Sequence, residues 1–132
     1  MTIESKTDQP PAFAQRMHVR AHTLLADVSQ ELGGSDAGPS PHDYFDASLA
    51  ACKTLTAHWY AKRSGIALDS VEVRIERDDA QERAGIYKLN VHLTYHGALS
   101  DAERHKLHAA VSRCPVHKLM TSSEVVIETA PL

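Results

Sequence analysis

The sequence predicts an α+β domain built in two layers from antiparallel sheets and a long helix. Three observations lead to this prediction. Segments with alternating apolar residues occur in pairs, as in β-hairpins, and helical segments separate them in the order ββ-α-ββ-α-β. No regular β-α-β crossover appears, which disfavours a doubly wound parallel sheet. The length of 132 residues suits a single domain.

Residues 1–14 are expected to form a flexible tail that precedes one domain at residues 15–132. The first stretch, MTIESKTDQPPAF, is polar and is interrupted by Pro10 and Pro11. It lacks the apolar core of a secretory signal, so we expect a cytoplasmic protein.

The domain is expected to begin with two short strands and a loop. Weak alternation of apolar residues between Gln15 and Val28 predicts two strands with a turn near residues 21–23. The stretch GGSDAGPSP at residues 33–41 has three glycines and two prolines, a composition that predicts a compact loop.

A long helix follows this loop. Ser40 is a suitable N-cap, Pro41 fits the first helical position, and Gly65 fits a left-handed C-cap. An apolar stripe at three- and four-residue steps contains Phe45, Leu49, Cys52, Leu55 or Thr56, and Trp59. Other apolar residues spread around the helix: Tyr44, Ala47, Ala51, Ala57, Tyr60 and Ala61. A helix that is apolar on several sides is usually buried on several sides, so a second subunit is a natural source of cover.

The remaining elements are a hairpin, two helices and a strand. Alternation at residues 71–77 and 87–97 predicts a β-hairpin with a polar loop. The capping-box sequence SDAE opens a second helix at residues 100–113. Pro115 starts a short helix, and EVVIETA at residues 124–130 predicts a closing strand.

The composition disfavours two classes of partner. The net charge is -3, from 14 basic and 17 acidic residues without a basic cluster, so we expect no nucleic-acid partner. No stretch approaches the roughly 18 apolar residues that span a bilayer, so we expect no membrane partner. In a reducing cytoplasm the two cysteines are expected to rest as thiols.

Cys114 is expected at the N-cap of the short helix. Unpaired backbone N–H groups and the helix dipole there would stabilise a thiolate and lower the thiol pKa. Arg113, His117 and Lys118 add positive charge nearby. The alternative is a small capping residue without reactivity.

Cys52 allows two interpretations. A cysteine on the apolar face of a helix is most often a buried small hydrophobe. A reactive thiol is the other interpretation, because Lys53 follows directly and the first turn of the helix is polar. The local sequence leaves both open.

A metal site has little support. The spacing of Cys114 and His117 could provide two zinc ligands, but no second ligand pair lies nearby. His92 and His96 lie in a predicted strand, about 13 Å apart, which is too far to bind one ion. We therefore expect no metal and no bound cofactor.

Three motifs stand in a specific order: the glycine-proline loop, the AAC helix that ends in YAKRSG, and CPVHKL before a final strand. In this order and spacing, the chain from about Met17 to Leu132 resembles the OsmC-like proteins, which include osmotically inducible protein C and the organic hydroperoxide resistance proteins. The resemblance implies an intertwined α+β homodimer with two active sites at the subunit interface and each long helix at the centre.

The resemblance also implies a thiol-dependent peroxidase that acts on organic hydroperoxides in oxidative-stress defence. Cys52 matches the attacking cysteine, which becomes a sulfenic acid. Cys114 matches the resolving cysteine, which forms a disulfide that an external dithiol, such as a dihydrolipoyl compound, reopens. The substrate would need an apolar pocket, for which the candidate lining residues are Tyr44, Phe45, Trp59 and Met120.

The first turn of the long helix departs from the pattern of the hydroperoxidase branches. Those branches place a glutamate directly after the proline and pair it with an arginine that activates the cysteine. Here His42 takes that position and Asp43 follows, while Arg16 and Arg20 are the candidate arginines. The departure keeps two alternatives open. One is a non-catalytic redox sensor or small-hydrophobe binder on the same dimeric fold, and the other is a dimeric structural protein with inert cysteines.

Overall fold

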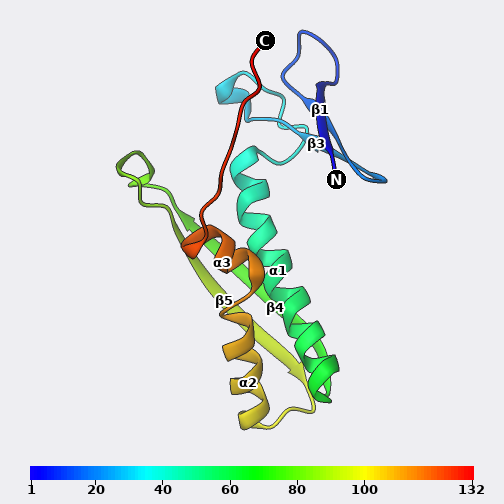
Figure 1. Ribbon diagram of the computed structural model, residues 1–132, viewed down its shortest axis with the longest axis vertical. Coiled ribbons are helices and arrows are strands. Elements are labelled where there is room, and N and C mark those ends of the chain that lie inside the picture. Colours follow the sequence, from blue (N-terminus) through cyan, green and yellow to red (C-terminus); the bar gives the residue numbers. More distant parts are fainter. The chain divides into compact units, whose positions relative to one another are not determined.

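The computed structural model describes all residues from 1 to 132 (Figure 1). The chain divides into two compact units, Met1–Phe45 and Asp46–Leu132, which we call the N-terminal and the C-terminal unit. The long helix α1 (Pro41–Ser64) contributes residues to both. Every strand pairing is antiparallel and helices follow the strands, so the predicted α+β class is confirmed.

The N-terminal unit contains a three-stranded sheet in the order β1-β2-β3. Its strands are β1 (Ile3–Thr7), β2 (Gln15–Val19) and β3 (His22–Ala26). The strand pair predicted between Gln15 and Val28 is confirmed as β2 and β3. Their turn includes Arg20, whose φ of 55° is left-handed, just before the position that the sequence predicts.

The sequence predicts a tail at residues 1–14, but the structure forms a strand within them. β1 pairs with β2 along its whole length, from Ile3 opposite Val19 to Thr7 opposite Gln15. All five side chains of β1 are exposed, so backbone hydrogen bonds rather than burial hold this edge strand. A polar segment gives no hydrophobic signal for such pairing, and sequence reasoning therefore reads it as a tail.

The loop between β3 and α1 is ordered by one buried carboxylate. The loop includes the short 3-10 helix η1 (Gln30–Leu32), and Asp27 at its start is 4% exposed. The Asp27 carboxylate accepts hydrogen bonds from three backbone N–H groups, those of Val28 (2.8 Å), Ser35 (3.1 Å) and Ala37 (3.0 Å). The predicted glycine-proline loop is therefore a fixed connection to α1.

α1 begins and ends at the residues that the sequence predicts. The Ser40 hydroxyl accepts a hydrogen bond from the Asp43 N–H at 3.2 Å, and the Asp43 carboxylate accepts one from the Ser40 N–H at 2.9 Å. These reciprocal bonds satisfy two backbone donors at the helix start. Gly65 follows the last turn with a φ of 67°, a conformation that glycine adopts at low cost.

The C-terminal unit places helices on one face of a hairpin (Figure 1). The hairpin consists of β4 (Leu68–Asp78) and β5 (Lys88–Gly97), with the 3-10 helix η2 (Glu82–Ala84) in its loop. α2 (Asp101–Val111) opens with the predicted capping box, and α3 (Pro115–Ser122) opens at the predicted proline. The predicted hairpin and both helices are therefore confirmed.

The core of this unit lies between α1, the hairpin and α2. Its buried members are Ala57, Ala61, Tyr95, Leu107 and Val111. The two alanines have short side chains, so the backbone of α1 can approach its neighbours closely.

The buried side of α1 differs from the predicted stripe. The buried residues follow a four-residue step: Leu49, Lys53, Ala57 and Ala61. Of the predicted stripe, Leu49 is buried and Cys52 is half-buried, whereas Phe45, Leu55 and Trp59 are exposed. The close packing of the alanines fixes the rotation of the helix and turns the larger apolar side chains toward solvent.

The strand predicted at residues 124–130 is not formed. This segment has no regular structure, and Val125, Val126 and Ile127 are exposed. A strand needs a neighbouring strand to satisfy its backbone groups, and an apolar sequence alone does not supply one.

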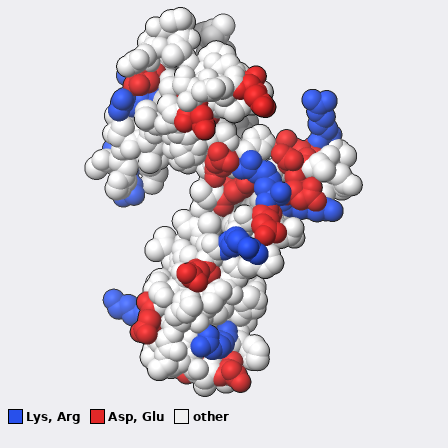
Figure 2. Space-filling view, turned by 180° about the vertical axis from the view of Figure 1, so that it is seen from behind, with Lys and Arg blue, Asp and Glu red and all other residues white.

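The surface carries charges of both signs. On the face shown in Figure 2, acidic and basic side chains are intermixed over both units. No helix is both long enough and apolar enough to cross a lipid bilayer.

Candidate thiol site

The fold brings the two cysteines together from different elements. Cys52 lies in the middle of α1, and Cys114 is the N-cap of α3, directly before Pro115. The Cys52 sulfur contacts the first turn of the helix that Cys114 caps, and both cysteines are free thiols. Cys114 is 0% exposed, whereas Cys52 is half-buried. Of the two cysteines, Cys52 is therefore the one with solvent exposure.

The N-terminus of α3 supplies a hydrogen-bond donor to Cys52. The backbone N–H of Val116, in the first turn of α3, donates to the Cys52 sulfur at 3.4 Å. This N–H is one of those that have no partner inside their own helix. Hydrogen bonds donated to a sulfur favour its anionic form, and the positive end of the helix dipole acts in the same direction. The N-terminus of α3 therefore points at the Cys52 sulfur.

Cys114 behaves differently from the expectation based on its N-cap position. Burial raises the pKa of the Cys114 thiol above its usual value, and the neighbouring Cys52 raises the pKa further. The Cys114 sulfur makes no capping hydrogen bond of normal geometry, although the N–H of His117 and the charge of Lys53 each lower the pKa. The expected lowering is therefore outweighed by burial, and the resting state of Cys114 is the protonated thiol.

A buried cation lies beside the thiol pair. Lys53 follows Cys52 on α1 and is 3% exposed. Its Nζ donates a hydrogen bond to the carbonyl oxygen of Val111, the last residue of α2, at 3.0 Å. The same Nζ lies 3.3 Å from Nδ1 of His117 in α3. An ammonium group can only donate, so His117 Nδ1 is the acceptor in this contact.

The part of the chain that contains the thiol site matches a known protein family. A sequence model of the OsmC-like protein family matches residues 33–130, a range that contains both cysteines. The chain belongs to the OsmC-like family. No curated protein matches the sequence. Membership of this family indicates a role in redox chemistry or stress defence.

Solved structures of OsmC-like proteins share the fold at low sequence identity. A putative osmotic stress induced and detoxification response protein from Psychrobacter arcticus has a TM-score of 0.72 and 19% identity, over 89% of this chain and 88% of that chain. An OsmC-like protein from Mycoplasma pneumoniae has a TM-score of 0.73 and 20% identity, over 92% and 86%. An organic hydroperoxide resistance protein OsmC from Legionella pneumophila has a TM-score of 0.61 and 23% identity, over 92% and 90%.

In this OsmC-like protein the four candidate supporting residues belong to the N-terminal unit. The Arg16 guanidinium forms an ion pair with Asp8 at 2.8 Å, and Arg20 is exposed in the turn between β2 and β3. His42 is exposed in the first turn of α1, and Asp43 caps that helix. The Asp43 carboxylate and the Arg16 guanidinium therefore each have a structural partner.

The candidate lining residues have varied surroundings. The Tyr44 hydroxyl donates a hydrogen bond to the Leu25 carbonyl oxygen. Phe45 and Trp59 are exposed, and the guanidinium of Arg63 lies 5.2 Å from the centre of the Trp59 ring. Met120 is half-buried in α3.

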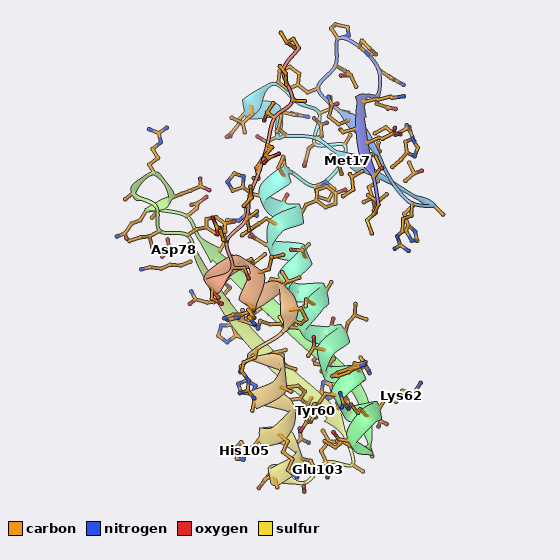
Figure 3. All side chains as sticks on the ribbon, viewed as in Figure 1. Met17, Tyr60, Lys62, Asp78, Glu103 and His105 are labelled. Carbon is orange, nitrogen blue, oxygen red and sulfur yellow. The ribbon has the colours of Figure 1, made fainter.

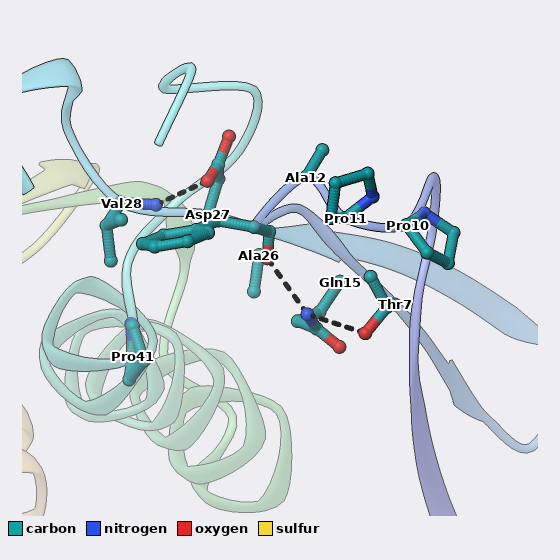
Figure 4. A pocket seen from close by; sticks show the side chains of 10 residues that line it. Thr7, Pro10, Pro11, Ala12, Gln15, Ala26, Asp27, Val28 and Pro41 are labelled. Atoms are coloured by element: carbon teal, nitrogen blue, oxygen red, sulfur yellow. Dashed lines mark hydrogen bonds between the residues drawn. The ribbon is translucent and has the colours of Figure 1, made fainter. Parts of the chain in front are cut away.

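A pocket of about 440 Å³ occurs within the N-terminal unit (Figure 4). Its apolar wall includes Pro10, Pro11, Phe13 and Val28, and none of the four candidate lining residues contributes to it. This pocket is therefore not the substrate pocket that the sequence predicts, because its lining residues are different.

Lys53 and His117 are the residues of the thiol site that sequence reasoning undervalued. Lys53 occupies the four-residue step of buried positions on α1, between Leu49 and Ala57. Its position directly after a cysteine is the local signal in the sequence that points to a role at the thiol site. No three His, Cys, Asp or Glu side chains gather in an arrangement that could hold a metal ion.

Proposed function

We propose that this OsmC-like protein is a thiol-dependent peroxidase that reduces organic hydroperoxides through Cys52 and Cys114. The observation that carries the proposal is the asymmetry of the thiol pair. Cys52 is half-buried and accepts a hydrogen bond from the N-terminus of α3, while Cys114, the N-cap of the same helix, is fully buried. This asymmetry suits an attacking sulfur and a resolving sulfur respectively.

The reaction has three steps. The Cys52 thiolate attacks the terminal oxygen of the hydroperoxide, the O–O bond breaks, and the alkoxide takes a proton to leave as an alcohol. Cys52 is now a sulfenic acid. The Cys114 sulfur then attacks the Cys52 sulfur, so that an S–S bond forms, the S–O bond breaks, and hydroxide takes the thiol proton to leave as water. An external dithiol reduces the disulfide and becomes a cyclic disulfide itself.

A turnover assay tests the proposal. Purified protein is supplied with cumene hydroperoxide and dihydrolipoamide, and loss of the hydroperoxide is followed with time. We expect continuous consumption by the wild type, none by Cys52→Ser, and a single oxidation to a dimedone-reactive sulfenic acid in Cys114→Ser. Absence of wild-type turnover, together with an unchanged Cys52→Ser variant, would overturn the enzyme assignment.

A second candidate function is a redox sensor or small-hydrophobe binder that does not turn over. Two contacts favour this second function. The Arg16 guanidinium is paired with Asp8, and the Asp43 carboxylate accepts a hydrogen bond at the start of α1, so both groups already have structural partners. It predicts ligand-dependent stabilisation that is equal in wild type and Cys52→Ser. Hydroperoxide turnover in the same assay would exclude it.

We further propose a cytoplasmic homodimer as the working form. Two observations support the dimer: Leu55 and Trp59 expose apolar side chains on the central helix, and residues 125–127 expose three more. Large exposed apolar side chains such as these are typical of protein interfaces. A reducing compartment would keep both cysteines available as thiols between catalytic cycles.

A further inference from the structure

Lys53 is a buried charged side chain for which the proposed reaction has no role so far. Removal of an ammonium group from water is strongly unfavourable unless hydrogen bonds or an opposite charge compensate. Its two hydrogen-bond partners, the Val111 carbonyl oxygen and His117 Nδ1, are dipoles rather than anions. The positive charge is therefore available to a negative charge that develops nearby.

The groups around Lys53 identify where that negative charge would form. The Val111 carbonyl oxygen that accepts the Lys53 ammonium also accepts the backbone N–H of Cys114, at 3.3 Å, so Lys53 lies beside this cysteine. Cys52 and Lys53 of α1 are the titratable groups that act on Cys114, and α3 contributes the backbone N–H of His117. Burial disfavours the Cys114 thiolate, whereas the charge of Lys53 lowers the thiol pKa. Two contacts fix the position of this cation, one from the end of α2 and one from α3.

We infer that the Lys53 ammonium, held between the Val111 carbonyl oxygen and the His117 imidazole, stabilises the anionic form of Cys114 during disulfide formation and disulfide reopening. This inference rests on the proposed cysteine chemistry. Lys53 thus acts on the resolving sulfur through its charge, and His117 holds the Lys53 ammonium in place.

The role of Lys53 follows from the charges in the two steps. In disulfide formation Cys114 must lose its proton to attack the sulfenic sulfur, and the proton goes to the departing hydroxide. In reopening, a thiolate of the external dithiol attacks the Cys52 sulfur, the S–S bond breaks, and its electron pair goes to Cys114. A nearby cation favours the Cys114 thiolate as nucleophile in the first step and as leaving group in the second.

The alternative is that Lys53 has a purely structural role, which the experiment must distinguish from the electrostatic role. Val111 ends α2, and a lysine that donates to a last-turn carbonyl is a common helix C-cap. A structural lysine would affect stability without changing the ionisation of Cys114. Lys53→Gln distinguishes the two roles, because the amide can still donate to the carbonyl but carries no charge.

The main experiment titrates Cys114 as the only thiol, in Cys52→Ser, and follows the ultraviolet absorbance of the thiolate against pH. Because this background cannot turn over, the result does not depend on peroxidase activity. We expect Lys53→Gln and Lys53→Met to shift the Cys114 titration to higher pH, and Lys53→Arg to restore it toward the parent. Lys62→Met is the matched control, because it removes the same charge from the same helix where Lys62 extends toward solvent (Figure 3).

A second measurement leaves Lys53 in place and so does not depend on the folding of its variants. In Cys52→Ser, the side-chain nitrogen resonance of Lys53 should change with the same midpoint as the Cys114 thiolate absorbance. Equal Cys114 titrations with and without the Lys53 charge, or a Lys53 resonance that does not respond, would overturn the inference.

Single-turnover kinetics connect the inference to the reaction. With otherwise wild-type protein, we expect Lys53→Gln to slow formation of the disulfide from the sulfenic acid by roughly three- to tenfold. If no disulfide forms in the wild type, the proposed function fails while the titration result stands. If the disulfide forms at the same rate in Lys53→Gln, the inference fails and the proposed function stands.

Discussion

At the scale of single residues, one carboxylate joins α1 to β4 and to Tyr87, the residue directly before β5. Asp46 accepts a hydrogen bond from Arg77 of β4 at 2.6 Å and another from the hydroxyl of Tyr87 at 2.7 Å. The Asp46 side chain is 13% exposed, so solvent screens these contacts only in part. Burial, followed by the hydrogen bond and charge of Asp46, raises the pKa of Tyr87 from 10.0 to about 12.

The raised pKa of Tyr87 predicts a pH dependence of stability. A group whose pKa is higher in the folded state stabilises the fold below its unfolded pKa, and this contribution is lost as the pH rises through the folded value. We expect Tyr87→Phe to be less stable than wild type by about 1 kcal/mol below pH 10, because it lacks the hydrogen bond. The difference in free energy of unfolding should shrink between pH 10.0 and about 12.

Urea unfolding of both proteins across this pH range measures the difference. Comparison of the two variants cancels the ionisation of lysines, arginines and the other tyrosines. As a check on the cause, Asp46→Asn should lower the pKa of Tyr87, followed by tyrosinate absorbance. A stability difference that stays constant with pH would show that Tyr87 ionises alike in both states.

At the scale of elements, the loop before α1 depends on Asp27 and on two glycines. A Cβ at Gly34 would lie 2.2 Å from the Val28 carbonyl oxygen, and one at Gly38 would lie 2.6 Å from the Leu25 carbonyl oxygen. These separations leave no room for a side chain against the backbone. The N–H groups of Ala37, Val28 and Ser35 together hold the pKa of Asp27 below its usual 3.8, although burial acts in the opposite direction.

We expect Asp27→Asn to lower the melting temperature at neutral pH, because an amide cannot replace a carboxylate that accepts three hydrogen bonds. A depressed pKa gives a contribution that is complete above the unfolded pKa and is lost as the pH falls. The melting temperatures of variant and wild type should therefore converge below pH 3.8. Asp36→Asn is the control, because it makes the same charge change at an exposed residue of the same loop. Equal effects of the two substitutions would rule out a special role for the Asp27 carboxylate.

Elements with local signals were predictable, and elements held by distant partners were not. The start of α1 and the capping box of α2 follow from side chains within one turn, and both were predicted. β1 depends on pairing with β2, and the polar sequence of β1 gives no indication of this pairing. The segment at residues 124–130 shows the reverse case, because it has a strand-like sequence but no adjacent strand.

The same distinction applies to the thiol site. Motifs near each cysteine in the sequence predict the pair, and the fold places Cys52 against the first turn of the helix that Cys114 caps. The burial of Lys53 could not be read from periodicity, because the larger apolar residues of α1 suggested a different buried stripe. The rotation of α1 is set by Ala57 and Ala61 against α2 and the hairpin, which is information from tertiary packing.

At the scale of the whole molecule, the apolar side chains left outside the core of α1 support self-association. Leu55 is 67% exposed and Trp59 is 60% exposed, one helical turn apart on the same side of α1. Ala57 and Ala61 fill the opposite side of the helix and pack within the chain. α1 therefore has one apolar side that the chain covers and one that a second copy could cover.

We expect sedimentation velocity to show a dimer that Leu55→Lys weakens. Loss of one buried leucine at the interface corresponds to a rise in the dissociation constant of roughly tenfold to a hundredfold. Trp59 is the only tryptophan, so its fluorescence reports on the same surface and should shift to longer wavelength as dilution dissociates the dimer. Ile86→Lys is the matched control, because Ile86 is also exposed but lies in the hairpin loop. The dimer would be contradicted if the wild type remained monomeric at every concentration and the Trp59 emission stayed constant. The exposed side of α1 would then have no second copy to cover it.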